Sequence, residues 1–265
     1  MPNEAVTLDL QAWFETPLGA YLLASEQAYF DQEVADVFGF NALQLGLCRN
    51  DFLRANRMPF QCRVGSLQRE AEADDGARIR AEFAALPILS NTADLVLLPH
   101  VLEFSDNPHQ VLREVARILM PEGHVIVSGF NPWSLWGARQ AFDRTHDVYP
   151  WRGQFITLPR LKDWMALLGF EITAGRMCCY IPPVSKQPWI GRLSFLEAAG
   201  DRWWPIAGGV YFLQAVKRVR GARLIMPKWS DRLAPVKQLA ASPQKVGEKE
   251  EALTVRSRET SNGTR

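Results

Sequence analysis

Several features that would identify a class of protein are missing from this sequence. Its apolar runs are far shorter than the ~20 residues that a helix needs to cross a bilayer, and we expect no membrane span. The N-terminal stretch MPNEAVTLDL lacks the basic and apolar regions of a signal peptide. These absences exclude an integral membrane protein and favour a cytoplasmic one.

Cysteine is also scarce. The four cysteines, Cys48, Cys62, Cys178 and Cys179, form no C-x-x-C pair. A zinc site needs spaced ligands, and disulfide scaffolds are typical of much shorter secreted chains. We therefore expect no metal site and interpret the cysteines as reduced, small apolar side chains.

The chain as a whole has no large excess of positive or negative charge, because its 265 residues carry a net charge of only +1. From Lys217 to the end, however, 12 Lys and Arg stand against 5 Asp and Glu. These positive charges are spread out and aromatic residues are nearly absent. Because nucleic-acid sites combine clustered charge with a defined surface, we expect a solvated, disordered tail over 221–265 and no nucleic-acid binding.

The apolar pattern of the rest is that of alternating strands and helices. The stretch ADLVLLPHVLEF, residues 93–104, is a buried strand, and NPHQVLREVARILM is an amphipathic helix followed by a strand at 124–130. This order is a βαβ unit and predicts a doubly wound, mostly parallel sheet. Further strands are expected at 42–47, 60–65, 77–83, 171–181 and 208–219, and further helices at 4–38 (with a break near residues 17–19), 50–56 and 158–170.

Three parts are predicted along the chain. Residues 1–38 form an N-terminal helical cap, 39–220 the α/β domain, and 221–265 the tail. Within the domain, residues 182–205 are rich in Pro, Trp and Gly and are interpreted as a loop or insertion, whose tryptophans suit a protein partner.

The central part of the chain resembles class I S-adenosylmethionine (SAM)-dependent methyltransferases of the type 11 group. The resemblance is carried, in the expected order, by Glu82 with Leu86-Pro87, by Asp94-Leu95-Val96, by residues 100–103 (HVLE) and by residues 117–123 (RILMPEG). It covers roughly residues 35–218 and extends to YFLQAVKR, which is similar to the antiparallel last strand of that fold. The segment GFNPWSLWG is similar to a group of uncharacterised bacterial proteins. The resemblance implies a Rossmann-like fold and SAM as cofactor.

Two of the three cofactor positions depart from the family pattern. In the first turn Gly46 aligns with the first glycine, but Cys48 and Asn50 stand where two more belong, and Gln44 replaces an acid. No acid ends the second strand to take the ribose hydroxyls, the nearest being Glu70. In the third position Glu82 stands where the family often has Asp.

The resemblance implies a cofactor site made by Gly46, Glu82, Phe83, Pro99 and His100. Glu82 would accept from the adenine amine, or it is a solvated carboxylate at a strand end. Phe83 would pack on the adenine. His100, after Pro99, is either a base tuned near neutral pH or a histidine packed against the next helix.

Acceptor residues are expected after the fifth strand, whereas catalytic residues are not identified. Asn131, Trp133 and Trp136 lie at that edge, and the tryptophans would clamp a flat or cationic substrate or simply pack a loop. Glu103 and Asp106 are interpreted as flanking or capping the following helix, and Asp94 as anchoring a turn.

Three functions remain open from the sequence. The first is SAM-dependent methyl transfer to a small molecule. The second is a non-catalytic binding or assembly partner on the same fold, which the missing glycines and ribose acid favour. An oxidoreductase is third, because a dinucleotide pyrophosphate needs the glycine-rich turn even more.

Overall fold

The structure is a computed structural model that describes residues 13–67, 78–142, 149–183, 191–193 and 195–219. All of them belong to the first of the chain's two compact units, Met1–Arg220. The predicted tail at 221–265 lies outside the described residues. Within the described residues, no helix combines the length and the apolar character that crossing a membrane requires.

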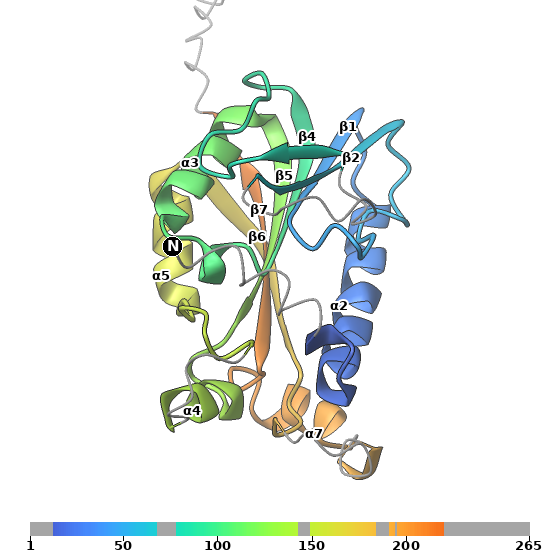
Figure 1. Cartoon of the computed structure of the whole chain (residues 1–265), viewed down its shortest axis with the longest axis vertical. Coiled ribbons are helices and arrows are strands. Elements are labelled where there is room, and N and C mark those ends of the chain that lie inside the picture. The colour runs from blue at the N-terminus through green and yellow to red at the C-terminus, as the bar shows by residue number, and fades with distance from the viewer. Residues whose placement is uncertain (1–12, 68–77, 143–148, 184–190, 194, 220–265) are drawn as a thin grey trace, which may run out of the picture. The chain divides into compact units, whose positions relative to one another are not determined.

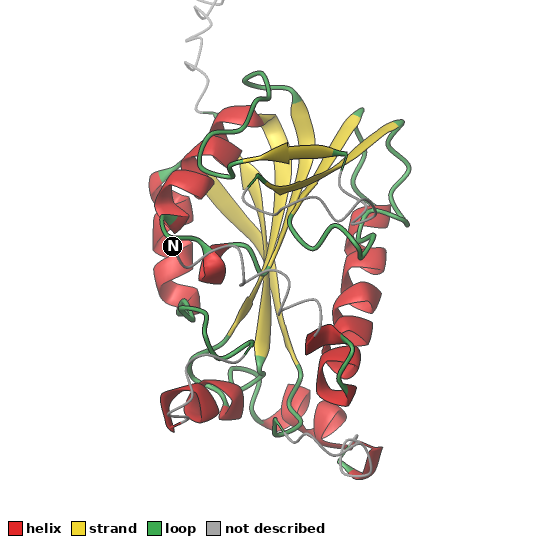
Figure 2. Cartoon of the chain, in the orientation of Figure 1, coloured by secondary structure: helices red, strands yellow, loops and turns green. Residues whose placement is uncertain are grey.

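One mixed sheet of seven strands organises the described residues, in the order β3-β2-β1-β4-β5-β7-β6 (Figures 1 and 2). The strands are β1 (Asn41–Leu45), β2 (Phe60–Ser66), β3 (Ile79–Ala81), β4 (Ala93–Pro99), β5 (Leu119–Phe130), β6 (Phe170–Cys178) and β7 (Val210–Lys217). Strands β1 to β5 pair in parallel, and β7 is antiparallel to both β5 and β6. The predicted Rossmann-like sheet with an antiparallel last strand is confirmed.

Helices cover both faces of this sheet (Figure 1). They are α2 (Pro17–Ala35), α3 (Pro108–Ile118), α4 (Leu135–Phe142), α5 (Leu158–Leu167) and α7 (Phe195–Trp203), with a 3-10 turn, η1 (Leu102–Phe104). Successive side chains of β4 point to opposite faces. Leu95 and Leu97 pack in the cluster that includes α2, and Val96 and Leu98 in the cluster that includes α3 and α5. This two-sided burial explains the continuous apolar run of β4.

Prolines begin the helices rather than break them. The predicted break lies directly before Pro17. Residues 13 and 14 are helical, residues 15 and 16 form a turn, and Pro17 stands in the first turn of α2, where its missing N–H costs nothing. The Thr16 side chain caps this helix by accepting from the Gly19 amide. In the same way Asn107 caps α3, accepting from the Gln110 amide at 3.1 Å.

The structure corrects one expected element and adds detail to another. Residues 50–56 form turns and not a helix, because the Gln44 side chain takes up the Asn50 carbonyl and the Phe52 amide that a helix would use. The segment 182–205, expected to be a loop or insertion, contains α7. Its Glu197 accepts from the backbone amides of Tyr180 and Ile181, which attaches this helix to the end of β6.

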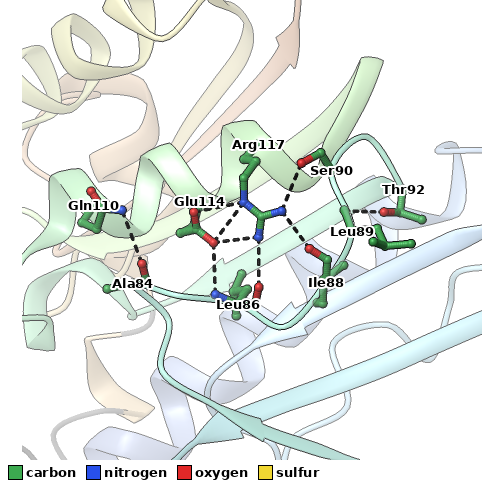
Figure 3. Close-up of polar contacts among 9 residues, drawn as sticks. All are labelled: Ala84, Leu86, Ile88, Leu89, Ser90, Thr92, Gln110, Glu114 and Arg117. Carbon is green, nitrogen blue, oxygen red and sulfur yellow. Dashed lines mark hydrogen bonds and ion pairs between the residues drawn. The ribbon is translucent and has the colours of Figure 1, made fainter.

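A guanidinium fixes the loop that leads into β4 (Figure 3). From α3, Arg117 donates to the carbonyls of Leu86 (2.9 Å) and Ile88 (2.8 Å) and to the Ser90 hydroxyl (3.1 Å). It also pairs with Glu114, which in turn accepts from the Leu86 amide at 3.0 Å. The RILMPEG motif therefore begins with a residue that holds the loop after β3 against α3.

Candidate functional site

The strand order places a topological switch point at the carboxyl ends of β1 and β4. These strands are neighbours, yet the segments that follow them pack on opposite faces. After β1, Phe52 and Leu53 join the α2 face, whereas after β4 helix α3 covers the other. Ligands of open α/β sheets bind at such a switch point. Gly46, Pro99 and His100 all lie there.

The turn after β1 has a bare backbone at its centre. Gly46 has φ of 76°, and Leu47, with φ of 45°, also takes the left-handed region. A Cβ at Gly46 would stand 3.2 Å from Val101 Cγ2 and 4.0 Å from the Phe83 ring. Cys48 and Asn50 do not have positive φ, so their backbone conformations do not require the two glycines that the family pattern has.

A buried amide holds this turn together. Gln44 is fully buried, and its Nε2 donates to the carbonyls of Gly46 (3.1 Å), Leu47 (3.2 Å) and Asn50 (2.8 Å). Its Oε1 accepts from the Phe52 amide at 3.1 Å. These three carbonyls need a hydrogen-bond donor, and an ionised acid at position 44 could only accept. The replacement of the family acid by Gln44 thus has a structural reason, which the sequence pattern did not show.

The third cofactor position lies beside the same turn. Phe83 follows β3, is half-buried and packs against the core cluster on the α3 face. Its ring is the one that a side chain at Gly46 would approach. Glu82 is exposed, and its carbonyl accepts from the Ala85 amide at 3.0 Å. Glu70, the nearest candidate for a ribose acid, lies outside the described residues.

His100 stands between two carboxyl groups in the interior. Its Nε2 lies 2.7 Å from Glu26 Oε1 of α2, and its Nδ1 lies 3.0 Å from Glu103 Oε1 of η1. The three side chains are at most 1% exposed. Glu103 Oε1 also accepts from the Phe130 amide at 2.6 Å. We call Glu26, His100 and Glu103 the buried trio.

The buried trio favours a protonated imidazole. Burial by itself would lower the pKa of His100, but the neighbouring carboxylates of Glu26 and Glu103 outweigh it and raise this pKa to about 10. The expected tuning near neutral pH is therefore wrong. Of the two roles expected for Glu103, capping the following helix is wrong, because its carboxyl group points to His100 and Asn107 is the cap. Glu103 flanks this helix from η1.

The acceptor candidates after β5 separate into buried and exposed residues. Asn131 is buried, and its Nδ2 donates to the carbonyls of Ile206 and Gly208, both at 2.9 Å. Trp136 is 1% exposed and donates to the Ile181 carbonyl at 2.9 Å. Trp133 is 64% exposed. In this conformation Trp133 is therefore the one of the three that is free to meet a ligand.

Glu26 was missed by the sequence analysis, although a signal for it exists. It lies on the buried stripe of α2 that Leu22 and Phe30 continue at a spacing of four residues. An acidic residue within such a stripe indicates a buried partner. Its partner, His100, is 74 residues away in the sequence, and only the fold brings the two together. Within the described residues, no group of three or more metal-ligand side chains is suited to hold a metal ion.

Comparison with known proteins agrees with this arrangement. Residues 62–127 match the family model of a methyltransferase domain. The fold is similar to that of a SAM-dependent methyltransferase, possible histamine N-methyltransferase, of Thermotoga maritima. The TM-score is 0.59 and the identity 17%, and the match covers 81% of this chain and 97% of that one. The matched methyltransferase domain and the similarity of fold agree with the resemblance seen in the sequence.

Two relatives indicate how far the similarity of sequence reaches. The chain is 28% identical over 172 residues to the uncharacterised protein YafS of Escherichia coli (strain K12), covering 65% of this chain and 69% of that protein. It is 26% identical over 141 residues to the malonyl-[acyl-carrier protein] O-methyltransferase of Hahella chejuensis, covering 52% of this chain and 50% of that protein.

Proposed function

We propose that this protein binds SAM and transfers its methyl group to a small-molecule acceptor. The observation that carries the proposal is the glycine turn at the switch point of the sheet. Gly46 has no side chain, so its backbone lies close to Val101 and the Phe83 ring, at the edge where open α/β sheets bind ligands. The methyltransferase domain matched over residues 62–127 supports the same ligand.

The cofactor residues have distinct roles in this proposal. The turn at Gly46 admits the amino-acid part of SAM, because a side chain there would occupy the space next to Phe83. Phe83 offers a half-buried ring for the adenine, and the exposed Glu82 carboxylate accepts from the adenine amine. Pro99 and the backbone of His100 end β4 at the same edge.

Methyl transfer requires little covalent chemistry from the protein's own residues. SAM, when bound, supplies a methyl group on a sulfonium sulfur. The chain's own residues position the ligands and exclude water, and such positioning is a large part of the rate enhancement of many enzymes. On the acceptor side, Trp133 provides an exposed aromatic face next to Asn131, which fixes its loop by accepting from the Trp133 amide at 3.0 Å.

Titration calorimetry with SAM and with S-adenosylhomocysteine tests the proposal. We expect a dissociation constant in the micromolar range, which corresponds to about −8 kcal/mol. Phe83→Ala and Glu82→Ala should each weaken binding by roughly 1–3 kcal/mol, the cost of a contact that the bound ligand would bury. Phe60→Ala is the matched control, because Phe60 is exposed at the amino end of β2.

The alternative function, a non-catalytic binding or assembly partner, predicts a different result in the same titration. A non-catalytic partner would give no heat up to millimolar ligand. The exposed tryptophans Trp203 and Trp204 of the Trp-rich segment would then be the surface to test for a protein partner.

A further inference from the structure

The buried trio has more negative than positive charge. Two carboxyl groups contact one imidazole ring, and all three side chains are enclosed by the protein. With both carboxyl groups ionised and the ring protonated, the trio carries a net charge of −1. An uncompensated charge in the interior is unfavourable by several kcal/mol. Something must therefore neutralise it, either a proton or a cation.

The trio also has unused hydrogen-bonding capacity. Both carboxylate oxygens of Glu26, Glu103 Oε2 and His100 Nε2 are buried and have no hydrogen-bond partner in the part of the chain that the structure describes. His100 Nε2 and Glu26 Oε1 are close enough for an ion pair, at 2.7 Å, but do not form a hydrogen bond. Ser128 Oγ, on β5 opposite Pro99 in the register, is likewise buried without a partner there. Buried polar groups in native proteins are nearly always hydrogen-bonded. The unpartnered carboxylate oxygens therefore indicate a bound group.

A metal ion does not fit this position. Both ring nitrogens of His100 already face carboxylate oxygens, so neither has a lone pair directed to a metal. Two carboxylate oxygens alone make a poor site for a divalent cation, which takes six or more oxygen ligands when it is calcium.

One aromatic ring lies next to the trio, and two more stack on that ring. The Phe130 ring centroid is 4.2 Å from that of His100, and the Phe130 amide donates to Glu103. Phe155 stacks on Phe130 at 4.9 Å, and Trp136 stacks at 6.0 Å. Carboxylates beside aromatic faces are the environment that organic cations prefer, because the rings attract the charge and tolerate its methyl groups.

We propose that the buried trio is a subsite for an organic cation, an ammonium or sulfonium group, at the methyl-transfer edge of the sheet. This inference rests on the proposed function and makes it more specific. The cation is either the sulfonium of SAM or an ammonium group of the acceptor. Helix α2 belongs to the predicted N-terminal helical cap. Through Glu26, this helix takes part in ligand recognition.

Access to the trio requires a side chain to move, since the carboxyl groups are not exposed in this conformation. The apparent affinity for a cation is then reduced by the fraction of molecules that are open. The test therefore compares, on the full-length protein, a cation with a neutral partner of the same shape or smaller by one methyl group. Any cost of opening cancels within each pair.

The first arm compares SAM with S-adenosylhomocysteine, and the second compares choline with its neutral analogue 3,3-dimethylbutan-1-ol. Each dissociation constant is measured by calorimetry for the native protein and for Glu26→Gln and Glu103→Gln. We expect either substitution to weaken the cation of one pair at least tenfold relative to its neutral partner. A change confined to the first pair identifies the sulfonium, and a change confined to the second identifies an acceptor ammonium.

Glu33→Gln is the matched control, because Glu33 lies on α2 and bonds Gln214 instead of the trio. It should leave both ratios unchanged. Near-ultraviolet circular dichroism establishes that each variant is folded. If both trio variants fold and both ratios stay as in the native protein, a proton neutralises the trio and the inference is refuted. If the native protein binds neither SAM nor S-adenosylhomocysteine, the proposed function fails, while the choline arm still decides the cation subsite.

Discussion

Replacing Arg117 with methionine should destabilise the protein and loosen the loop that precedes β4. The guanidinium makes three hydrogen bonds to this loop, to the carbonyls of Leu86 and Ile88 and to Ser90 (Figure 3). Methionine keeps much of the apolar stem but removes every donor. Glu114 then also loses its ion pair.

The magnitude follows from these contacts. A hydrogen bond in a folded protein contributes about 1 kcal/mol net. The Arg117 side chain is 35% exposed, and the ion pair with Glu114 is therefore counted at no more than about 0.5 kcal/mol. We expect Arg117→Met to lower the free energy of unfolding by about 3 kcal/mol. Arg117→Lys should lose about half as much, because a single ammonium cannot reach all these acceptors.

Urea denaturation followed by tryptophan fluorescence measures these losses. Arg113→Met is the matched control, since Arg113 is an exposed residue of the same helix. It should change stability by less than about 0.5 kcal/mol. If Arg117→Met costs no more than Arg113→Met, the reasoning that this guanidinium fixes the loop is wrong.

Three further predictions concern single side chains. Gln44→Glu should destabilise the folded state by about 2–4 kcal/mol, since a carboxylate cannot donate to three carbonyls; denaturation that matches the native protein would contradict this. Asp94→Ala should cost about 1–2 kcal/mol, because Asp94 Oδ2 accepts from the amides of Phe40 and Asn41; Asp163→Ala, at an exposed position of α5, is the comparison. The raised pKa of His100 should make stability fall as pH rises from about 6.5 towards 10, and His100→Gln should remove this dependence.

The sign of the pH dependence follows from linkage. In the folded protein burial disfavours the charged ring, but Glu26 and Glu103 more than compensate, and the pKa of His100 is raised to about 10. The folded state therefore holds its proton more tightly than the unfolded state. The resulting stabilisation is complete below about pH 6.5, the unfolded pKa, and is lost as the pH approaches the folded pKa. Stability that rises over this interval would refute the assignment.

The sequence alone determined the fold and the edge of the sheet that holds the candidate site. Buried parallel strands are covered on both faces, so they appear as continuous apolar runs such as ADLVLLP in β4. The order of these runs and of the amphipathic α3 fixes the topology, because parallel connections are short and of one hand. The carboxyl ends of β1 and β4 are then the expected place for Gly46 and His100.

Only the tertiary structure decided what the polar residues at that edge contact. Glu26 and Gln44 have no local pattern that names their partners, because these are a histidine 74 residues away and three carbonyls of a tight turn. The missing glycines had suggested a damaged turn, but φ at Cys48 and Asn50 is not positive. Hydrogen bonds and charge pairs form between groups that packing brings together. Their partners therefore depend on the distances that folding sets, and hydrophobic periodicity does not encode them.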